Sequence, residues 1–204
     1  MAGASGEKAQ RVLCDWDGVN ERVQAERAEL LAITARDAFE RREITLTSGR
    51  TSNYYIDGKQ VTLRPRGAYL FAKIILEALR GQPVDAIGGP TLGADPIVGA
   101  VVALSEAEGR PIPGFIVRKE PKKHGTRSLI EGNLGPGARV VILEDVITTG
   151  GSILRAIEAA EGCGAQVVGV IVLTDRQEGG KADLEARGYP CYAVFTAKEL
   201  AEAK

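Results

Sequence analysis

Along most of the chain, the spacing of apolar positions predicts strands and helices in alternation. Continuous apolar runs predict short strands at 84–87, 112–117, 139–143, 167–173 and 191–195. Between them, apolar residues spaced three and four apart predict helices at 93–108, 152–161 and 182–187. Strands that are apolar at nearly every position are typical of a parallel sheet covered on both faces. The pattern therefore predicts an α/β fold with a central, mostly parallel sheet flanked by helices.

The N-terminal part of the chain follows a different pattern. Apolar residues at helical spacing predict one long amphipathic helix at about 19–42 and a second at 66–80. Two short β-rich pieces lie between them, at 44–50 and 54–58, and the turn-like residues that separate them predict a small hairpin. Farther along, 118–137 shows little apolar periodicity. A loop of that length inside a compact domain is usually functional, so we expect a mobile loop there.

Composition narrows the class of protein. The 204 residues carry a formal net charge of −1, with 44% hydrophobic and 26% charged residues, which is typical of a soluble globular protein. The near-neutral charge argues against a general nucleic-acid binder, and no apolar run reaches the roughly 20 residues of a membrane span. We therefore expect neither a nucleic-acid nor a membrane partner. We expect 1–18 to be a flexible tail and 19–204 a single domain.

Residue types that bind metals or form disulfides are few. Cys14, Cys163 and Cys191 are odd in number and form no C-x-x-C pair, so neither a disulfide framework nor a zinc knuckle is expected. This cysteine usage favours a reducing, cytoplasmic location. The single histidine, His124, excludes any site that needs two imidazoles.

The most informative segment begins at the apolar strand 139–143. Two acids, Glu144 and Asp145, come next, and a loop rich in hydroxyl groups and glycines, Thr148 to Ser152, leads into the following helix. Glycines let a ligand approach the backbone, and a helix start directs free N–H groups at an anion. The loop therefore predicts a phosphate cradle, although it lacks the lysine of a Walker loop.

The two acids need another role, because carboxylates repel phosphate. Glu144 and Asp145 are suited to accept hydrogen bonds from a sugar diol that lies one ribose length from the phosphate. The alternative is structural: the acids cap the turn, and the loop is an ordinary connection between strand and helix. The order of strand, acids, loop and helix favours the ligand site.

Positive charge is concentrated in one short segment, 118–127. It holds five Lys or Arg residues and one Glu, a net charge of +4, which leaves −5 for the remainder of the chain. Pro121 and Gly125 disfavour a helix, so we expect a flexible basic loop. Such a loop can close over a polyanionic leaving group and stabilise its charge, whereas a solvated charged loop is the alternative. His124, in the same segment, is suited to contact an anion.

The segment from Val140 to Ser152 resembles the phosphoribosyl-pyrophosphate motif of type I phosphoribosyltransferases. The resemblance implies the type I phosphoribosyltransferase fold, with a small N-terminal hood from about 19–62 and a mobile catalytic loop at about 118–132. It also implies that the acids hold the ribose hydroxyls and that the loop holds the 5′-phosphate. The residues that would bind phosphoribosyl pyrophosphate here are Glu144, Asp145, Val146, Ile147, Thr148, Thr149, Gly150, Gly151 and Ser152.

Further segments resemble one family of these enzymes, the orotate phosphoribosyltransferases. They match its early S-G-R-x-S-x-Y-Y-x-D signature, its catalytic loop and its second glycine-rich turn, and they lie at Thr47 to Asp57, Arg118 to Thr126 and Gly88 to Ala94. Arg176 follows a strand where that family has an orotate-contacting arginine. The matches occur in the family's order and cover roughly residues 20–195.

The resemblance implies a reaction, in which phosphoribosyl passes from 5-phospho-α-D-ribose 1-diphosphate to N1 of orotate. The products are orotidine 5′-monophosphate and diphosphate, in the pathway to UMP. Mg²⁺ would be bound chiefly by substrate oxygens, with no metal site of protein side chains. The protein would be a homodimer that shares loop residues across its interface, with Lys119 serving in the neighbouring site.

The resemblance also implies the role of individual residues. The residues that would contact pyrophosphate are Arg118, Lys119, Lys122 and His124. The residues that would contact orotate are Thr148, Arg176, Tyr55 and Ile56. The catalytic residues would be Lys122, Lys119, His124 and Asp145. Two positions depart from the family pattern. Many members carry Lys where this chain has Thr47, and Tyr-Lys where it has Leu92 and Gly93. Arg50 or Lys59 would then supply the missing charge.

Two other functions stay open. One is a phosphoribosyltransferase for another base. The early signature and the strand-end arginine both argue against it. The other is a non-catalytic regulator of the same fold that senses phosphoribosyl pyrophosphate. Such a regulator has no need of a leaving-group loop, yet this chain retains the loop with its cations.

Overall fold

The structure is a computed structural model, and it describes residues 16–45, 51–121 and 128–204. Its helices are α1 (Trp16–Arg22), α2 (Gln24–Asp37), α3 (Lys59–Thr62), α4 (Pro65–Ala78), α5 (Asp95–Ala107), α6 (Gly151–Gly162), α7 (Gly180–Ala186) and α8 (Ala197–Ala203). Its strands are β1 (Phe39–Glu40), β2 (Ile44–Thr45), β3 (Thr51–Ser52), β4 (Tyr55–Ile56), β5 (Ala86–Pro90), β6 (Gly114–Val117), β7 (Ile130–Gly132), β8 (Arg139–Ile147), β9 (Gln166–Asp175) and β10 (Cys191–Thr196). Each of these helices is too short or too polar to span a membrane.

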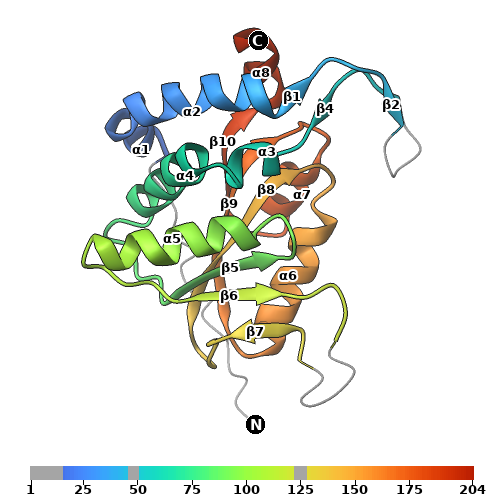
Figure 1. Cartoon of the computed structure of the whole chain (residues 1–204). Coiled ribbons are helices and arrows are strands. Elements are labelled where there is room, and N and C mark those ends of the chain that lie inside the picture. Colours follow the sequence, from blue (N-terminus) through green and yellow to red (C-terminus); the bar gives the residue numbers. More distant parts are fainter. Residues whose placement is uncertain (1–15, 46–50, 122–127) are drawn as a thin grey trace.

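Six strands form one central sheet, in the order β10-β9-β8-β5-β6-β7 (Figure 1). Neighbouring strands are parallel, except that β7 pairs antiparallel with β6 at one edge. In the middle of the sheet, Val141 of β8 lies between Ile87 of β5 and Gly169 of β9. The predicted α/β fold with a mostly parallel central sheet is confirmed.

Alternate residues of the central strands face two separate layers of helices (Figure 1). In β8, Val141 and Leu143 join the core that includes α2, α4 and α5, whereas Val140 and Ile142 pack with α6. All four side chains are fully buried. Because successive side chains point to opposite faces of a strand, a continuous apolar run is required to fill both layers.

The carboxyl ends of the parallel strands meet at one edge of the sheet. β5 and β8 are neighbours, yet the chain continues from β5 into α5 on one face and from β8 into α6 on the other (Figure 1). This is a topological switch point, where open α/β sheets bind ligands. Along the same edge the strand ends follow in the order β9, β8, β5 and β6, so the segments after these four strands lie side by side.

Two pairs of short strands lie beyond this edge (Figure 1). β1 pairs with β4, and β2 with β3, both antiparallel. The single hairpin predicted between 44–50 and 54–58 is therefore wrong, since the residues expected to turn, 51–52, form a strand. Residues 46–50 lie outside the described ranges. Propensity could not choose among these short β-rich pieces, because pairing is decided by contacts between strands.

The long helix predicted at 19–42 is divided in two. α1 and α2 are separated at Val23, and α2 ends five residues early because the chain continues into β1. α1 begins inside the expected tail of 1–18, and the remainder of that tail is not among the described residues. Trp16 stacks on Tyr192 of β10, with ring centroids 4.0 Å apart, which fixes the start of α1 against the sheet.

The short helix α3 was not predicted, and neither were β7 and α8. β7 lies within the expected loop 118–137, where Glu131 pairs with Ile116 of β6. α8 closes the chain and begins with a capping box, because Thr196 Oγ1 accepts from Glu199 N–H and Glu199 Oε2 accepts from Thr196 N–H. The spacing of a threonine and a glutamate three residues later is a sequence signal for a helix start.

The capping box should contribute measurably to stability. Thr196→Ala removes the side-chain acceptor for the N–H of Glu199, so the free energy of unfolding should fall by about 1 kcal/mol. Thr196→Ser keeps the hydroxyl group and should stay close to wild type. Urea denaturation followed by circular dichroism measures both variants, and equal losses in the two would contradict the role of the cap.

Candidate active site

Two carboxylates are buried at the end of β8. Glu144 is 5% exposed and Asp145 6%. Ser152 donates its hydroxyl hydrogen to Glu144 Oε2 at 3.1 Å, and Val146 N–H donates to Asp145 Oδ1 at 2.9 Å. Burial, followed by the charge of Asp145, raises the pKa of Glu144 to about 8. Near neutral pH, Glu144 therefore holds a proton for much of the time.

The glycine-rich loop after β8 is shaped by close backbone packing. Gly150 has a φ of +78°, a conformation that favours glycine, and α6 begins at the next residue. Gly180 of α7 packs so closely on this loop that a Cβ there would lie 2.4 Å from the carbonyl oxygen of Thr148. The start of α6, with its free N–H groups, is thereby fixed at the switch point, where it can stabilise an anion.

The turn after β5 covers the carboxylates from another side. A Cβ on Gly93 would lie 1.9 Å from Glu144 Oε1 and 2.6 Å from Asp145 Oδ1, so a larger residue there would require the carboxylates to move. Thr91 stabilises the turn by donating its hydroxyl hydrogen to Asp95 Oδ2 at 2.7 Å. The second glycine-rich turn of the sequence is therefore in direct contact with the paired acids.

A lysine at the start of α3 approaches Asp145. Lys59 Nζ is 2.9 Å from Asp57 Oδ1 and 3.3 Å from Asp145 Oδ2. Burial opposes its charge, but hydrogen bonding to Asp57 and attraction to Asp145 outweigh burial and raise the pKa of Lys59 to about 12. Lys59 and Asp145 are 86 residues apart in the chain, so no local pattern could predict this ion pair.

The strand-end arginine lies at the neighbouring strand of the same edge. The side chain of Arg176 is only 4% exposed, and its Nε donates to Glu178 Oε1 at 2.8 Å. Its guanidinium carbon lies 4.9 Å from the centroid of the Tyr54 ring, and Tyr54 Oη donates to its carbonyl oxygen at 3.1 Å. Arg176 N–H also donates to the carbonyl of Ile147, the residue before Thr148. The structure thus brings Arg176 close to the loop after β8 and to the start of β4.

The other two residues predicted for the base are Tyr55 and Ile56, which form β4. Ile56 is buried, and the Tyr55 ring is half-buried beneath the guanidinium of Arg42, whose central carbon is 4.5 Å from the ring centroid. Tyr54, which contacts Arg176, directly precedes them, so both predicted base contacts of this segment start beside Arg176.

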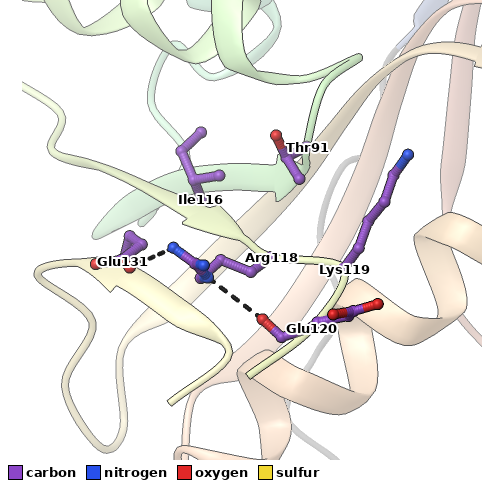
Figure 2. Close-up of a pocket in the computed structure, with 6 residues that line it drawn as sticks. All are labelled: Thr91, Ile116, Arg118, Lys119, Glu120 and Glu131. Atoms are coloured by element: carbon purple, nitrogen blue, oxygen red, sulfur yellow. Dashed lines mark hydrogen bonds and ion pairs between the residues drawn. The ribbon is translucent and has the colours of Figure 1, made fainter. Parts of the chain in front are cut away.

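The described part of the basic loop starts at the end of β6. Arg118 Nη1 is 3.2 Å from Glu131 Oε1 of β7, and its Nε donates to the carbonyl of Glu120 at 3.3 Å (Figure 2). Lys119 is exposed and extends away from this pair (Figure 2). β7, the strand that the sequence did not predict, therefore holds the base of the loop in place.

A hollow of about 600 Å³ opens between this loop and the turn after β5, lined by Thr91, Ile116, Arg118, Lys119, Glu120 and Glu131. The two other residues predicted to contact the leaving group, Lys122 and His124, lie outside the described residues, as do Thr47 and Arg50. No group of three or more His, Cys, Asp or Glu side chains suited to a metal ion occurs in the described part of the chain.

A mostly parallel sheet covered on both faces, with buried acids and a glycine-rich loop at its switch point, is the architecture of type I phosphoribosyltransferases. The chain matches the family model described as "Phosphoribosyl transferase domain" over residues 32–189, and it belongs to this family.

Among phosphoribosyltransferases, the chain is similar to proteins named orotate phosphoribosyltransferase. The chain is 47% identical over 175 residues to the orotate phosphoribosyltransferase of Nostoc sp., covering 85% of this chain and 84% of the relative. It is 48% identical over 155 residues to that of Aquifex aeolicus, covering 76% and 85%. It resembles the crystal structure of Mycobacterium tuberculosis orotate phosphoribosyltransferase in complex with 5-phospho-alpha-D-ribosyl 1-diphosphate. There the TM-score is 0.72 at 38% identity, covering 86% of this chain and 99% of that chain.

The raised pKa of Glu144 predicts a pH-dependent effect on stability. The folded protein holds this proton up to about pH 8, whereas the unfolded chain releases it near pH 4.5. The contribution of Glu144 to the free energy of unfolding therefore falls as the pH rises from 4.5 to 8. Glu144→Gln cannot ionise. Its free energy of unfolding relative to wild type should therefore increase by on the order of 2 kcal/mol between pH 5 and pH 8.

Urea denaturation at the two pH values measures this difference. Glu106→Gln, at an exposed position of α5, is the matched control and should show no comparable change. An identical pH response in the two variants would mean that burial does not hold a proton on Glu144.

Proposed function

We propose that this chain is an orotate phosphoribosyltransferase that makes orotidine 5′-monophosphate and diphosphate for pyrimidine biosynthesis. One observation carries the proposal: the order of chemical groups along the carboxyl edge of the sheet. Arg176 follows β9, the acids and the glycine loop belong to β8, the glycine turn follows β5, and Arg118 follows β6. That order matches the order of base, ribose phosphate and pyrophosphate in the reacting substrates. Relatives of that name at 47–48% identity support it.

In this proposal the edge of β8 binds the ribose phosphate. Glu144 and Asp145 accept hydrogen bonds from the 2′- and 3′-hydroxyls, since both are oxygen acceptors at the switch point. The 5′-phosphate lies at the start of α6, where free N–H groups and hydroxyl groups favour an anion. The residues of this cradle are Val146, Ile147, Thr148, Thr149, Gly150, Gly151 and Ser152.

Orotate is proposed to bind beside Arg176. A guanidinium suits a planar anion with carbonyl and carboxylate edges, because its donors lie in one plane. Contacts with Tyr54 and Glu178 hold this side chain in a single orientation. Thr148 and the backbone of Tyr55 and Ile56 complete the base site.

The basic loop is proposed to bind the leaving pyrophosphate through Arg118, Lys119, Lys122 and His124. In the reaction N1 of orotate bonds to C1 of the ribose while the bond from C1 to the pyrophosphate oxygen breaks, and pyrophosphate departs with that electron pair. The proton of N1 is released to water. No protein nucleophile is required, so positioning and electrostatic stabilisation by the loop and by Asp145 carry the rate. We further propose a homodimer, in which exposed Lys119 serves the neighbouring active site.

Mg²⁺ is the cofactor that we propose. The acids at the edge offer hard oxygen donors in a pair, and no larger cluster is present in the described ranges. This donor set fits an ion that arrives with its substrate, because Mg²⁺ keeps much of its coordination on phosphate oxygens and water. When bound, the ion would neutralise charge on the pyrophosphate. A cytoplasmic location is part of the proposal, and it agrees with the free thiols of Cys163 and Cys191.

One assay tests the function. The protein is mixed with phosphoribosyl pyrophosphate, Mg²⁺ and orotate, and the loss of orotate absorbance is followed. Adenine, hypoxanthine and uracil serve as alternative bases. Turnover confined to orotate supports the proposal. Turnover of another base would indicate a different phosphoribosyltransferase, and binding of phosphoribosyl pyrophosphate without any turnover would indicate a regulator.

Arg176 should decide recognition of the base. Arg176→Lys removes the planar, multiply donating edge, so the KM for orotate should rise at least tenfold while the KM for phosphoribosyl pyrophosphate changes little. Arg187→Lys, at the exposed end of α7, is the matched control. Initial rates at varied concentrations of each substrate separate the two effects, and a rise confined to the phosphoribosyl pyrophosphate KM would exclude the assignment.

Lys122 should matter most for the departure of pyrophosphate. Lys122→Ala removes a cation that stabilises charge developing in the transition state, so kcat should fall by about 10²-fold or more. The exposed Lys198→Ala should leave kcat unchanged. Thermal unfolding should be the same for both variants, and near-normal turnover by Lys122→Ala would disprove its role.

A further inference from the structure

One short segment contacts both halves of the candidate site. At its start, Tyr54 stacks on Arg176 and donates a hydrogen bond to its carbonyl oxygen. At its end, Lys59 pairs with Asp145 at 3.3 Å. The six residues 54–59 therefore connect the arginine proposed for the base with an acid proposed for the ribose.

The far end of this segment is packed tightly against Asp145. A Cβ on Gly58 would lie 2.7 Å from the Cβ of Asp145, so the backbone there directly contacts the carboxylate side chain. Asp57 holds the Lys59 ammonium from the opposite side at 2.9 Å and also accepts from the Lys59 N–H at 3.2 Å. The lysine thus bridges two carboxylates, one in its own turn and one in β8.

The glycine turn itself supplies no cation to these acids. The space beside Gly93 is filled by Glu144 Oε1 and Asp145 Oδ1, which lie 1.9 and 2.6 Å from the position of a Cβ. Among the described residues, the ammonium that pairs with Asp145 is that of Lys59, at the start of α3. Its raised pKa, about 12, keeps it charged throughout the pH range in which an enzyme is assayed.

We propose that Lys59 is a positioning residue, which holds the Asp145 carboxylate in place and fixes the base-recognition segment 54–59 against it. This inference rests on the proposed function. The ion pair sets the distance between the ribose acids and Arg176, and with it the distance between C1 of the ribose and N1 of the base. The residue acts through Asp145 and need not touch either substrate.

The expected defect follows from this role. Without the ammonium, segment 54–59 keeps the packing of Gly58 but loses its ion pair with Asp145, while the phosphate cradle after β8 and the Arg176 side chain remain. Substrates should still bind, but their reacting atoms should be less well aligned. A displacement of about 1 Å costs on the order of 10²-fold in rate, so kcat should change far more than either KM.

The experiment compares three variants of the full chain in the orotate assay. Lys59→Met keeps the length of the side chain and removes the charge; we expect kcat to fall about 10- to 100-fold, with each KM within about threefold of wild type. Lys59→Arg can still bridge two carboxylates, and it should recover most of the rate. Lys73→Met removes another paired lysine, that of the ion pair with Glu26 in α2, and should behave like wild type.

The outcomes separate positioning from simple stabilisation. A loss of kcat in Lys59→Met that Lys59→Arg restores, with both melting temperatures near wild type, supports the inference. A kcat within twofold of wild type, or an equal defect in Lys73→Met, overturns it. If Lys59→Met does not fold, Asp57→Asn provides the second test, because it removes the other carboxylate that pairs with the ammonium. It should likewise lower kcat while each KM changes little.

Failure of the proposed function would be recognised separately. Wild-type protein that does not convert orotate contradicts the proposed function before any variant is assayed. Calorimetric titration of wild type and Lys59→Met with phosphoribosyl pyrophosphate then tests Lys59 directly. Affinities within about threefold agree with positioning, whereas loss of binding in Lys59→Met shows a direct ligand contact and overturns the inference.

Discussion

The burial of two adjacent carboxylates at the end of β8 sets the conditions that the surrounding structure has to meet. Buried charges are costly unless they are paired and hydrogen-bonded. Glu144 meets this condition through the hydroxyl of Ser152 and through its raised pKa, and Asp145 through Lys59 and a backbone N–H. The start of α3, 86 residues away in the chain, is thereby brought to the acids at the switch point of the sheet.

Close backbone approach is the second consequence of this burial. Gly58 and Gly93 both lie where a Cβ would collide with the acids, and Gly180 lies where one would collide with the loop after β8. Glycine avoids these collisions, which arise from contacts with other segments and not from an unusual φ. The positive φ of Gly150 is a different case, since it turns the chain directly into α6.

The sequence predicted the elements that depend on local pattern. The central strands, the helices between them and the order of acids, glycines and helix start were all readable, because apolar periodicity and glycine spacing are properties of neighbouring residues. The same reasoning failed for the short strands near the N-terminus, for β7 and for the break at Val23. Their conformation depends on partners elsewhere in the fold, and propensity is a weak guide to such pairing.

The sequence by itself determined the class of fold, the family and the chemical types of residue in the site. Only the tertiary structure decided which of them meet. It brought Lys59 to Asp145 and Tyr54 to Arg176, across 86 and 122 residues of chain, and it placed both carboxylates against the backbone of Gly93. The physical reason is that ion pairing and steric exclusion act over a few ångströms in space, and distance along the chain carries no information about them until the sheet is formed.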